Sequence, residues 1–293
     1  MAQGESDSRA LMVYDTGGNP AGAAVAARSA RRAGAAVILG PVFSAEVPAV
    51  LAIVGSGLPV VTFSNDLALL ERGAFLLGIT AGQVVAAILA YAARRGVRRI
   101  AIGGSPDTWG EQARAAAMIS ASSLGLSSYL LPAGELKQLG PAASSSEDAL
   151  PDAVLMTSAA DMLSMAPAAA AQGVQLLGSP LDLDLDPDEL RVLDGAWLAA
   201  PDPARFAGFA RTFEDRNGSP PGTIAGLAFD AVNIVQQVRL GGGLDRSGIL
   251  AADGFRAVCG DVRFRDNGSA ARALAILTVA NGGLRTVAAA AMV

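Results

Sequence analysis

The chain has 293 residues, of which 52% are hydrophobic and 17% charged, so it is long and apolar enough for one large domain or two ordinary ones with a buried core. Lys and Arg number 22 against 27 Asp and Glu, and the net charge of -5 makes nucleic acid a poor default partner. The absence of histidine excludes a Ser-His-Asp triad, a Cys-His pair and every His-ligated metal site. The single cysteine, Cys259, can form neither an internal disulfide nor a four-cysteine zinc site.

The first residues, MAQGESDSR, are polar and do not have the apolar centre of a signal peptide. Residues 73–93 form an uncharged run that is long enough to suggest a membrane span. Much of its apolarity comes from alanine, and glycines and polar residues interrupt it. A buried strand followed by a helix therefore explains this run better than a span does.

Short apolar runs alternate with alanine-rich stretches along most of the chain. The first run, residues 11–14, predicts a strand, after which Asn19 caps a helix that has Pro20 in its first turn. The same periodicity predicts further strands at 37–39, 59–63, 75–79, 99–102, 128–131, 153–156, 175–177 and 197–199. It predicts helices at 20–33, from 44 to about 55, 81–95, 109–124, up to about 172, 203–216 and 224–240. This alternation is typical of parallel βαβ units, here in two α/β halves that meet near residues 102–109.

Three segments depart from this alternation. Residues 132–152 predict a loose connection, and residues 181–190 predict an acidic loop. Near the C-terminus, Asp-Asn-Gly at 266–268 predicts a hairpin between strands 262–264 and 273–279, and a second turn leads into 284–287.

Candidate binding residues follow the expected strands, because ligands of open α/β sheets bind beyond the carboxyl ends of the strands. Ser44 opens an expected helix, where it either binds an anion such as a carboxylate or caps its own helix. Thr62, Ser64 and Asn65 close the next strand, and a polar ligand cradle and ordinary turn chemistry explain them about equally well. Trp109 either covers a ligand or packs in the core.

Other site types find little support in the sequence. No glycine-rich phosphate loop of either common type follows a strand, which disfavours nucleotide binding. Asp182 belongs to an acidic run that lacks the glycine and terminal glutamate of a calcium-binding EF-hand loop, so a solvated loop is the favoured interpretation. We therefore expect no cofactor and no metal.

The order of several segments resembles a known family. These segments are YDTGGNP at 14–20, ILGPVFS at 38–44, LPVVTFS at 58–64, RIAI at 99–102, WGE at 109–111, LG at 177–178 and the closing stretch 261–268. Together they resemble type I periplasmic binding proteins of the Leu/Ile/Val-binding group over nearly the whole chain.

The resemblance implies an α/β fold of two Rossmann-like lobes with parallel sheets, which close by a hinge on a ligand in the cleft between them. Lobe one would comprise residues 9–103 and about 224–258, and lobe two 104–223 and about 259–293, with 132–152 as a flexible connection. That family normally begins with a strand and a helix that precede the strand at 11–14. Because this unit is missing here, the resemblance implies an N-terminally truncated lobe one with uncovered apolar surface.

The resemblance also implies roles for individual residues. The positions of Ser44 and Ser64 hold the carboxylate and ammonium of an amino acid in that family, and the position of Trp109 carries an aromatic ring that covers the ligand. Ser158 lies on the corresponding loop of the second lobe. Amino-acid binders place an acidic residue just after position 178, where this chain offers only Asp182 as a loose substitute.

These implications favour a non-catalytic, extracytoplasmic solute-binding component of an ABC transporter, with amino acids or similar small polar solutes as ligand and a permease as partner. Penicillin-binding protein activators share the fold and have stretches similar to residues 15–20 and 63–66. The alternative is therefore a regulator of cell-wall synthesis whose partner is a penicillin-binding protein, since fold alone does not separate the two functions.

Overall fold

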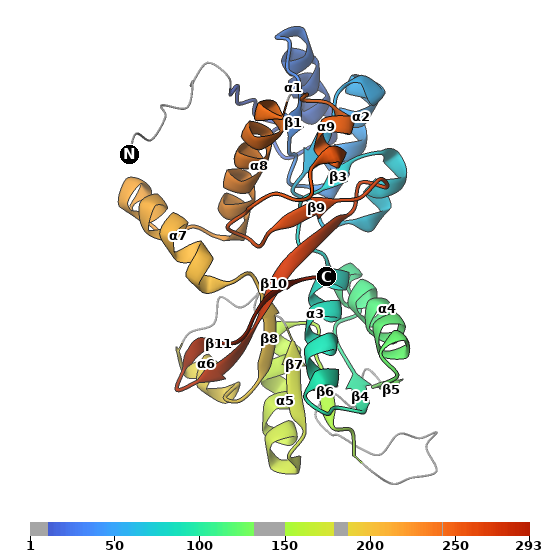
Figure 1. The fold of residues 1–293 in the computed structure, drawn as a ribbon, viewed down its shortest axis with the longest axis vertical. Helices are drawn as coiled ribbons and strands as arrows, with labels where there is room; N and C mark the ends of the chain where they lie inside the picture. Colours follow the sequence, from blue (N-terminus) through green and yellow to red (C-terminus); the bar gives the residue numbers. More distant parts are fainter. Residues whose placement is uncertain (1–10, 132–149, 179–186, 242) are drawn as a thin grey trace. The chain divides into compact units, whose positions relative to one another are not determined.

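The computed structural model describes residues 11–131, 150–178, 187–241 and 243–293 (Figure 1). It forms two compact units, the first from Met1–Gly78, Ile224–Ala257 and Arg263–Ala270, and the second from Ile79–Thr223, Val258–Val262 and Ala271–Val293. The first boundary lies at Gly78 rather than at residue 103, because α3 (Ala81–Arg94) packs on α4 (Thr108–Ser123) in the second unit. Most of the expected flexible connection, residues 132–149, lies outside the described residues.

The first unit is built on a parallel three-stranded sheet of order β1-β2-β3. Ile38 pairs with Val60 and Thr62 with Leu76 in its register. The strands are β1 (Ile38–Leu39), β2 (Val60–Thr62) and β3 (Phe75–Leu76). The helices of this unit are α1 (Pro20–Arg32), α2 (Val47–Val54), α8 (Thr223–Leu240) and α9 (Arg246–Ala251), with short 3-10 helices η1 (Ser44–Glu46), η2 (Gly55–Gly57) and η3 (Leu67–Arg72).

Helix α1 begins as its sequence predicts. The Asn19 side chain accepts a hydrogen bond from the Gly22 amide, and Pro20 occupies the first turn, where a missing N–H costs nothing. Alanines 23, 27 and 30 are buried on one face of the helix, which packs on α2 and its Val50 and Val54. Small side chains on this face let the two helices approach closely.

The predicted strand at residues 11–14 is wrong. These residues have no regular secondary structure, and the Val13 side chain is 88% exposed. A strand needs a neighbour to satisfy its backbone N–H and C=O groups, and among the described residues no strand pairs with this segment. The apolar pattern of four residues does not carry that information.

The second unit is built on a larger sheet of order β11-β10-β8-β7-β6-β4-β5, with β9 paired to β10. The strands from β8 to β5 are parallel, and β10 and β11 add to them in antiparallel fashion. Its strands are β4 (Arg99–Ile102), β5 (Ser127–Leu130), β6 (Ala153–Leu155), β7 (Gln175–Gly178), β8 (Trp197–Ala200), β9 (Val262–Phe264), β10 (Ala270–Ala280) and β11 (Gly283–Met292). Besides α3 and α4, its helices are α5 (Ala159–Gln172), α6 (Pro187–Val192) and α7 (Pro203–Asn217).

One part of the core of the second unit lies between this sheet and α5. Met162 and Met165 of α5 are fully buried against strand residues such as Val154, Leu176 and Leu198. The apolar residues of α5 recur with the period of a helix, whereas those of the strands form continuous runs. The two sets pack together in this layer, as expected for a parallel sheet covered by helices.

The C-terminal hairpins and the acidic segment test two further predictions. Strand β9 pairs with β10 as predicted, and Asn281 and Gly282, both at positive φ (54° and 72°), form the tight turn into β11. The predicted acidic loop at 181–190 is wrong from Pro187 onward, where α6 begins.

No helix within the described ranges combines the length and apolarity needed to cross a bilayer, and residues 73–93 divide between β3 and α3.

Candidate functional site

The loops that follow β1 and β2 are joined at the carboxyl edge of the first unit's sheet. The Pro41 carbonyl accepts hydrogen bonds from the Thr62 hydroxyl at 2.7 Å and from the Phe63 amide at 3.2 Å. Thr62 is completely buried. The structure therefore brings the two predicted loops together, and Thr62 acts in this contact as an internal support rather than as a group open to a ligand.

Ser44 does not cap a helix, so that part of the sequence interpretation is wrong. It is the first residue of the short η1, whose capping position is Phe43 and has no side-chain hydrogen bond. A three-residue 3-10 helix has no macrodipole of the kind that binds anions. The Ser44 side chain is half-buried, and its hydroxyl has no hydrogen-bond partner among the residues the structure covers. It is free to bond a ligand.

The two residues after Thr62 differ in what they offer. Ser64 is buried, its amide donates to the Thr62 hydroxyl at 3.1 Å, and its own hydroxyl accepts from the Asp66 amide at 3.2 Å. These hydrogen bonds stabilise a turn, which is one of the two roles that the sequence suggested for Ser64. Asn65 is exposed, and within the described ranges its side-chain amide makes no hydrogen bond. Asn65 therefore offers donors and an acceptor that the fold does not use.

In the second unit, the loops after β4 and β6 are packed tightly together. The Trp109 indole N–H donates to the Thr157 carbonyl at 3.1 Å, which fixes the half-buried ring between the two loops. A Cβ at Gly104 would lie 1.8 Å from the Thr157 hydroxyl oxygen, so only glycine allows this approach. The Thr157 hydroxyl is buried and has no partner among the described residues.

Ser158 caps α5 and takes part in a small polar cluster. Its hydroxyl accepts from the Asp161 amide at 3.1 Å and donates to the Asp161 carboxylate at 2.6 Å. The Ser105 hydroxyl donates to the same carboxylate oxygen at 3.2 Å. The carboxylate lies in the first turn of α5, where the helix dipole favours a negative charge. One carboxylate thus connects the loops after β4 and β6.

Sequence reasoning missed Ser105 and Asp161 as site residues. The signal for Asp161 was the Ser-x-x-Asp spacing from Ser158, a capping pattern that places an acidic residue near the start of a helix. Ser105 gave no comparable signal. Arg114 of α4 holds this loop by donating to the carbonyls of Gly104 and Ser105 at 3.0 and 2.5 Å.

Asp182 lies outside the described residues. Within the part of the chain that is described, no cluster of three His, Cys, Asp or Glu side chains is placed to hold a metal ion.

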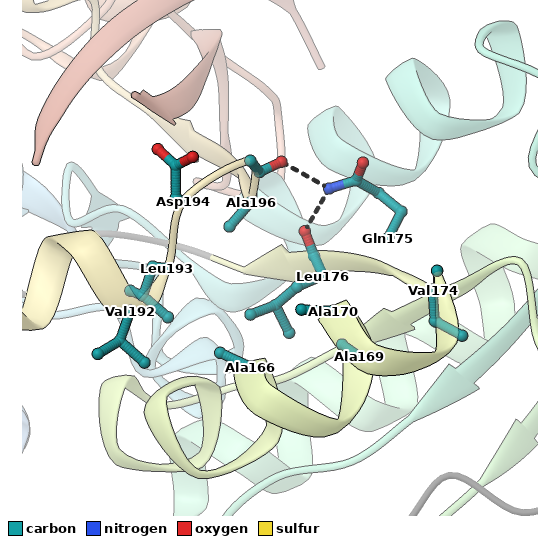
Figure 2. A pocket seen from close by; sticks show the side chains of 12 residues that line it. Ala166, Ala169, Ala170, Val174, Gln175, Leu176, Val192, Leu193, Asp194 and Ala196 are labelled. Carbon is teal, nitrogen blue, oxygen red and sulfur yellow. Dashed lines mark hydrogen bonds between the residues drawn. The ribbon is translucent and has the colours of Figure 1, made fainter. Parts of the chain in front are cut away.

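The structure also contains two cavities, and the second reaches Leu39 and Pro41 at the end of β1. The first, of about 270 Å³, is lined by α5, β7 and the loop before β8 in the second unit (Figure 2). Figure 2 shows Gln175 at its rim, where the side-chain amide donates to the Leu176 and Gly195 carbonyls at 3.0 and 2.9 Å. The second, of about 410 Å³, lies in the first unit beside β1. None of the predicted site residues that are described lines either cavity.

Parallel sheets with polar groups at their carboxyl edges define a class of α/β ligand-binding proteins. A model of the family described as periplasmic binding protein matches residues 10–283, and the chain therefore belongs to this family. Comparison with curated proteins found no match.

Solved structures share the fold at low sequence identity. A putative branched-chain amino acid ABC transporter from Rhodospirillum rubrum is 19% identical, with a TM-score of 0.77, covering 93% of this chain and 86% of that one. A solute-binding protein of an ABC transporter from R. palustris, in complex with benzoate, is 16% identical, with a TM-score of 0.62 and coverage of 94% and 83%. Full-length LpoA from Haemophilus influenzae is 13% identical, with a TM-score of 0.67, covering 94% of this chain and 52% of that one.

Proposed function

We propose that this chain is a non-catalytic, extracytoplasmic solute-binding protein of an ABC transporter that binds a small carboxylate. The observation that carries the proposal is the pair of polar side chains, Ser44 and Asn65, which follow neighbouring strands and have no partner among the described residues. A half-buried hydroxyl such as that of Ser44 is normally paired within the protein, and the exposed Asn65 amide beside it is open to a ligand as well.

The chemistry of these groups favours a carboxylate. A serine hydroxyl and an amide NH₂ both donate hydrogen bonds, and a carboxylate only accepts them. The titles of two structural relatives name a branched-chain amino acid transporter and a benzoate complex. Leucine-type ligands and benzoate share a carboxylate on an apolar body, and we propose the same class of solute for this chain.

The second unit supplies a complementary set of groups. We propose that Trp109 packs its ring on the apolar body of the ligand, and that the Asp161 carboxylate accepts from an ammonium where the ligand has one. Ser105 and Ser158 then act as positioning residues, because their hydroxyls orient Asp161. Binding would close the two units on the ligand by hinge motion.

The test is thermal unfolding of the purified chain with a panel that contains leucine, alanine, benzoate, 4-hydroxybenzoate and, as a comparison that lacks the carboxylate, leucinamide. A ligand that binds only the native state adds about 2.7 kcal/mol at a hundredfold excess over its Kd. We expect one carboxylate class to raise Tm, and leucinamide to have no effect. A chain that melts cooperatively with no shift for any carboxylate would refute the proposal.

A matched pair of variants locates the site. The double variant Ser44→Ala/Asn65→Ala should lose the ligand-induced shift, whereas Ser122→Ala, an exposed serine on α4, should keep it. An equal shift in both proteins would show that the ligand binds elsewhere.

The second candidate function is regulation of a cell-wall synthase. The match to LpoA, a penicillin-binding protein activator, over 94% of this chain favours it. This function predicts capture of a penicillin-binding protein from envelope extracts by the immobilised chain, whereas transport predicts capture of a permease. Capture of a permease together with a carboxylate-induced thermal shift would exclude the regulator as the main role.

A further inference from the structure

The chain contains three Asn-Gly pairs, and the asparagine of each is exposed. They are Asn217–Gly218, Asn267–Gly268 and Asn281–Gly282. An asparagine before glycine is open to attack on its side-chain carbonyl by the next backbone nitrogen, because glycine has no Cβ to hinder the approach. The three pairs lie in different structural settings, and their local hydrogen bonds separate them.

Asn217 is the last residue of α7, and both reacting groups of its pair are engaged at the end of that helix. The Asn217 side-chain amide donates to the Phe213 carbonyl at 2.8 Å. The Gly218 amide donates to the Glu214 carbonyl at 2.7 Å. The glycine nitrogen has to reach the asparagine side chain before the two can react, so both hydrogen bonds must break first.

Asn267 lies at the tip of the β9–β10 hairpin and is held in a similar way. Its side-chain oxygen accepts from the Ser269 amide at 3.0 Å. The Gly268 amide donates to the Arg265 carbonyl at 2.8 Å. A Cβ at Gly268 would lie 2.2 Å from the Ala74 carbonyl oxygen, so this pair is closely packed as well as hydrogen-bonded.

Asn281–Gly282, the tight turn between β10 and β11, differs from the other two pairs. The Asn281 side chain makes no hydrogen bond within the described ranges, and the Gly282 amide makes none there either. The backbone amide of Asn281 donates to the Asp194 carboxylate at 3.2 Å, which leaves the Asn281 side chain open. Of the three pairs, this one alone has both reacting groups unengaged among the residues that the structure describes.

We propose that Asn281 is a site of spontaneous deamidation. The Gly282 backbone nitrogen loses its proton and bonds to the side-chain carbonyl carbon of Asn281. The side-chain nitrogen takes up a proton and leaves as ammonia, which closes a five-membered imide. Water then opens the imide at either of its two carbonyls, and the products are aspartate and isoaspartate. The reaction needs no reactant other than water.

Both products weaken the β10–β11 hairpin. Each adds a carboxylate to the turn whose backbone amide already bonds the Asp194 carboxylate, and the two negative charges repel. Isoaspartate also lengthens the backbone by one methylene group, which the two-residue turn does not accommodate. A Cβ at Gly282 would lie 3.1 Å from the Pro187 carbonyl oxygen, so a distorted turn also disturbs α6.

The first test compares the three pairs in the native and in the urea-unfolded chain. The purified full chain is incubated at mildly alkaline pH, and peptide mass spectrometry measures deamidation at each asparagine. In the native chain we expect Asn281 to react about tenfold or more faster than Asn217 and Asn267, because each of those pairs must first break two hydrogen bonds. In urea the three pairs should react at similar rates.

The second test measures what the modification does to stability. The urea midpoint of the wild type should fall as Asn281 deamidates, whereas Asn281→Gly, which keeps the turn but has no side chain to react, should keep its midpoint over the same incubation. Asn281→Asp should have a lower midpoint than the unmodified wild type, because aspartate tolerates the same backbone conformation as asparagine and differs in charge.

Two results would overturn the proposal. One is an Asn281 that stays intact in the native chain, or reacts no faster than Asn217 and Asn267, although it reacts in urea. The other is a wild type in which Asn281 is modified but the urea midpoint stays unchanged, since the hairpin would then tolerate both products.

Discussion

Replacing Gly104 by alanine should destabilise the second unit at the point where its two site loops meet. The new Cβ would lie 1.8 Å from the Thr157 hydroxyl oxygen and 2.7 Å from its Cβ, far inside van der Waals contact. Gly104 also has a φ of 147°, a backbone conformation that residues with a Cβ rarely adopt.

The two effects can be sized separately. Overpacking a filled site costs about 1–3 kcal/mol, and backbone strain of this kind about 1–3 kcal/mol more. The expected loss of unfolding free energy is therefore about 2–6 kcal/mol, a large part of the total stability of a domain. For a unit of this size each kcal/mol lowers Tm by about 2–4 °C.

Urea unfolding and calorimetry of three proteins test this reasoning. Gly125→Ala is the control for strain alone, because Gly125 has a φ of 69° but no heavy atom near its missing Cβ. Adding Thr157→Ala to Gly104→Ala should recover part of the loss, since it removes the hydroxyl but leaves the Thr157 Cβ position occupied. If Gly104→Ala costs no more than Gly125→Ala, the tight loop packing described above is refuted.

Further predictions concern single buried or charged groups. Glu46 is buried, and one of its carboxylate oxygens has no hydrogen-bond partner among the described residues. Urea titration of Glu46→Met should therefore show an unfolding free energy that is unchanged or higher by about 1 kcal/mol. A clear loss of unfolding free energy would contradict this. A guanidinium nitrogen of Arg205 lies 2.6 Å from a carboxylate oxygen of Asp261, and both side chains are about one-third exposed. Arg205→Ala should therefore lower the unfolding free energy by less than about 1 kcal/mol, and the loss should shrink in high salt. Burial raises the pKa of Tyr129 above its ordinary value, although the Arg99 charge opposes the shift. Because the folded state then holds this proton more tightly than the unfolded state, stability should decline as pH rises through about 10, and Tyr129→Phe should lessen the decline.

The alternation of strands and helices was predictable because each element carries its own local pattern. The run Arg99–Ile102 and the helical face of Ala81–Arg94 appear in the structure as expected. The strand predicted at residues 11–14 does not form, for the opposite reason. Its pattern is that of a strand, but whether it forms one depends on a neighbouring strand that no local pattern encodes. α9 (Arg246–Ala251) was missed because it is short and its apolar residues are too few to show a period.

The positions of the two loops after β1 and β2 were predictable, but the hydrogen bonds of their side chains were not. Thr62, Ser64 and Asn65 follow β2 as the apolar run before them implied, and Pro41 joins their loop to the loop of Ser44. Which hydroxyls remain open depends on hydrogen bonds across the two loops, and these follow from packing. A helix cap was one of two interpretations of Ser44, and its hydroxyl makes no cap, whereas the Ser64 hydroxyl is engaged in the turn.

The most direct measurement of ligand binding at the proposed site uses tryptophan fluorescence. The chain has 2 tryptophans, and Trp197→Phe leaves Trp109 as the only one while keeping an aromatic ring against Tyr91. If a small carboxylate binds where we propose, titration should change the Trp109 emission and saturate at one ligand per chain. An emission spectrum that stays unchanged at high concentrations of every carboxylate in the panel would contradict the account.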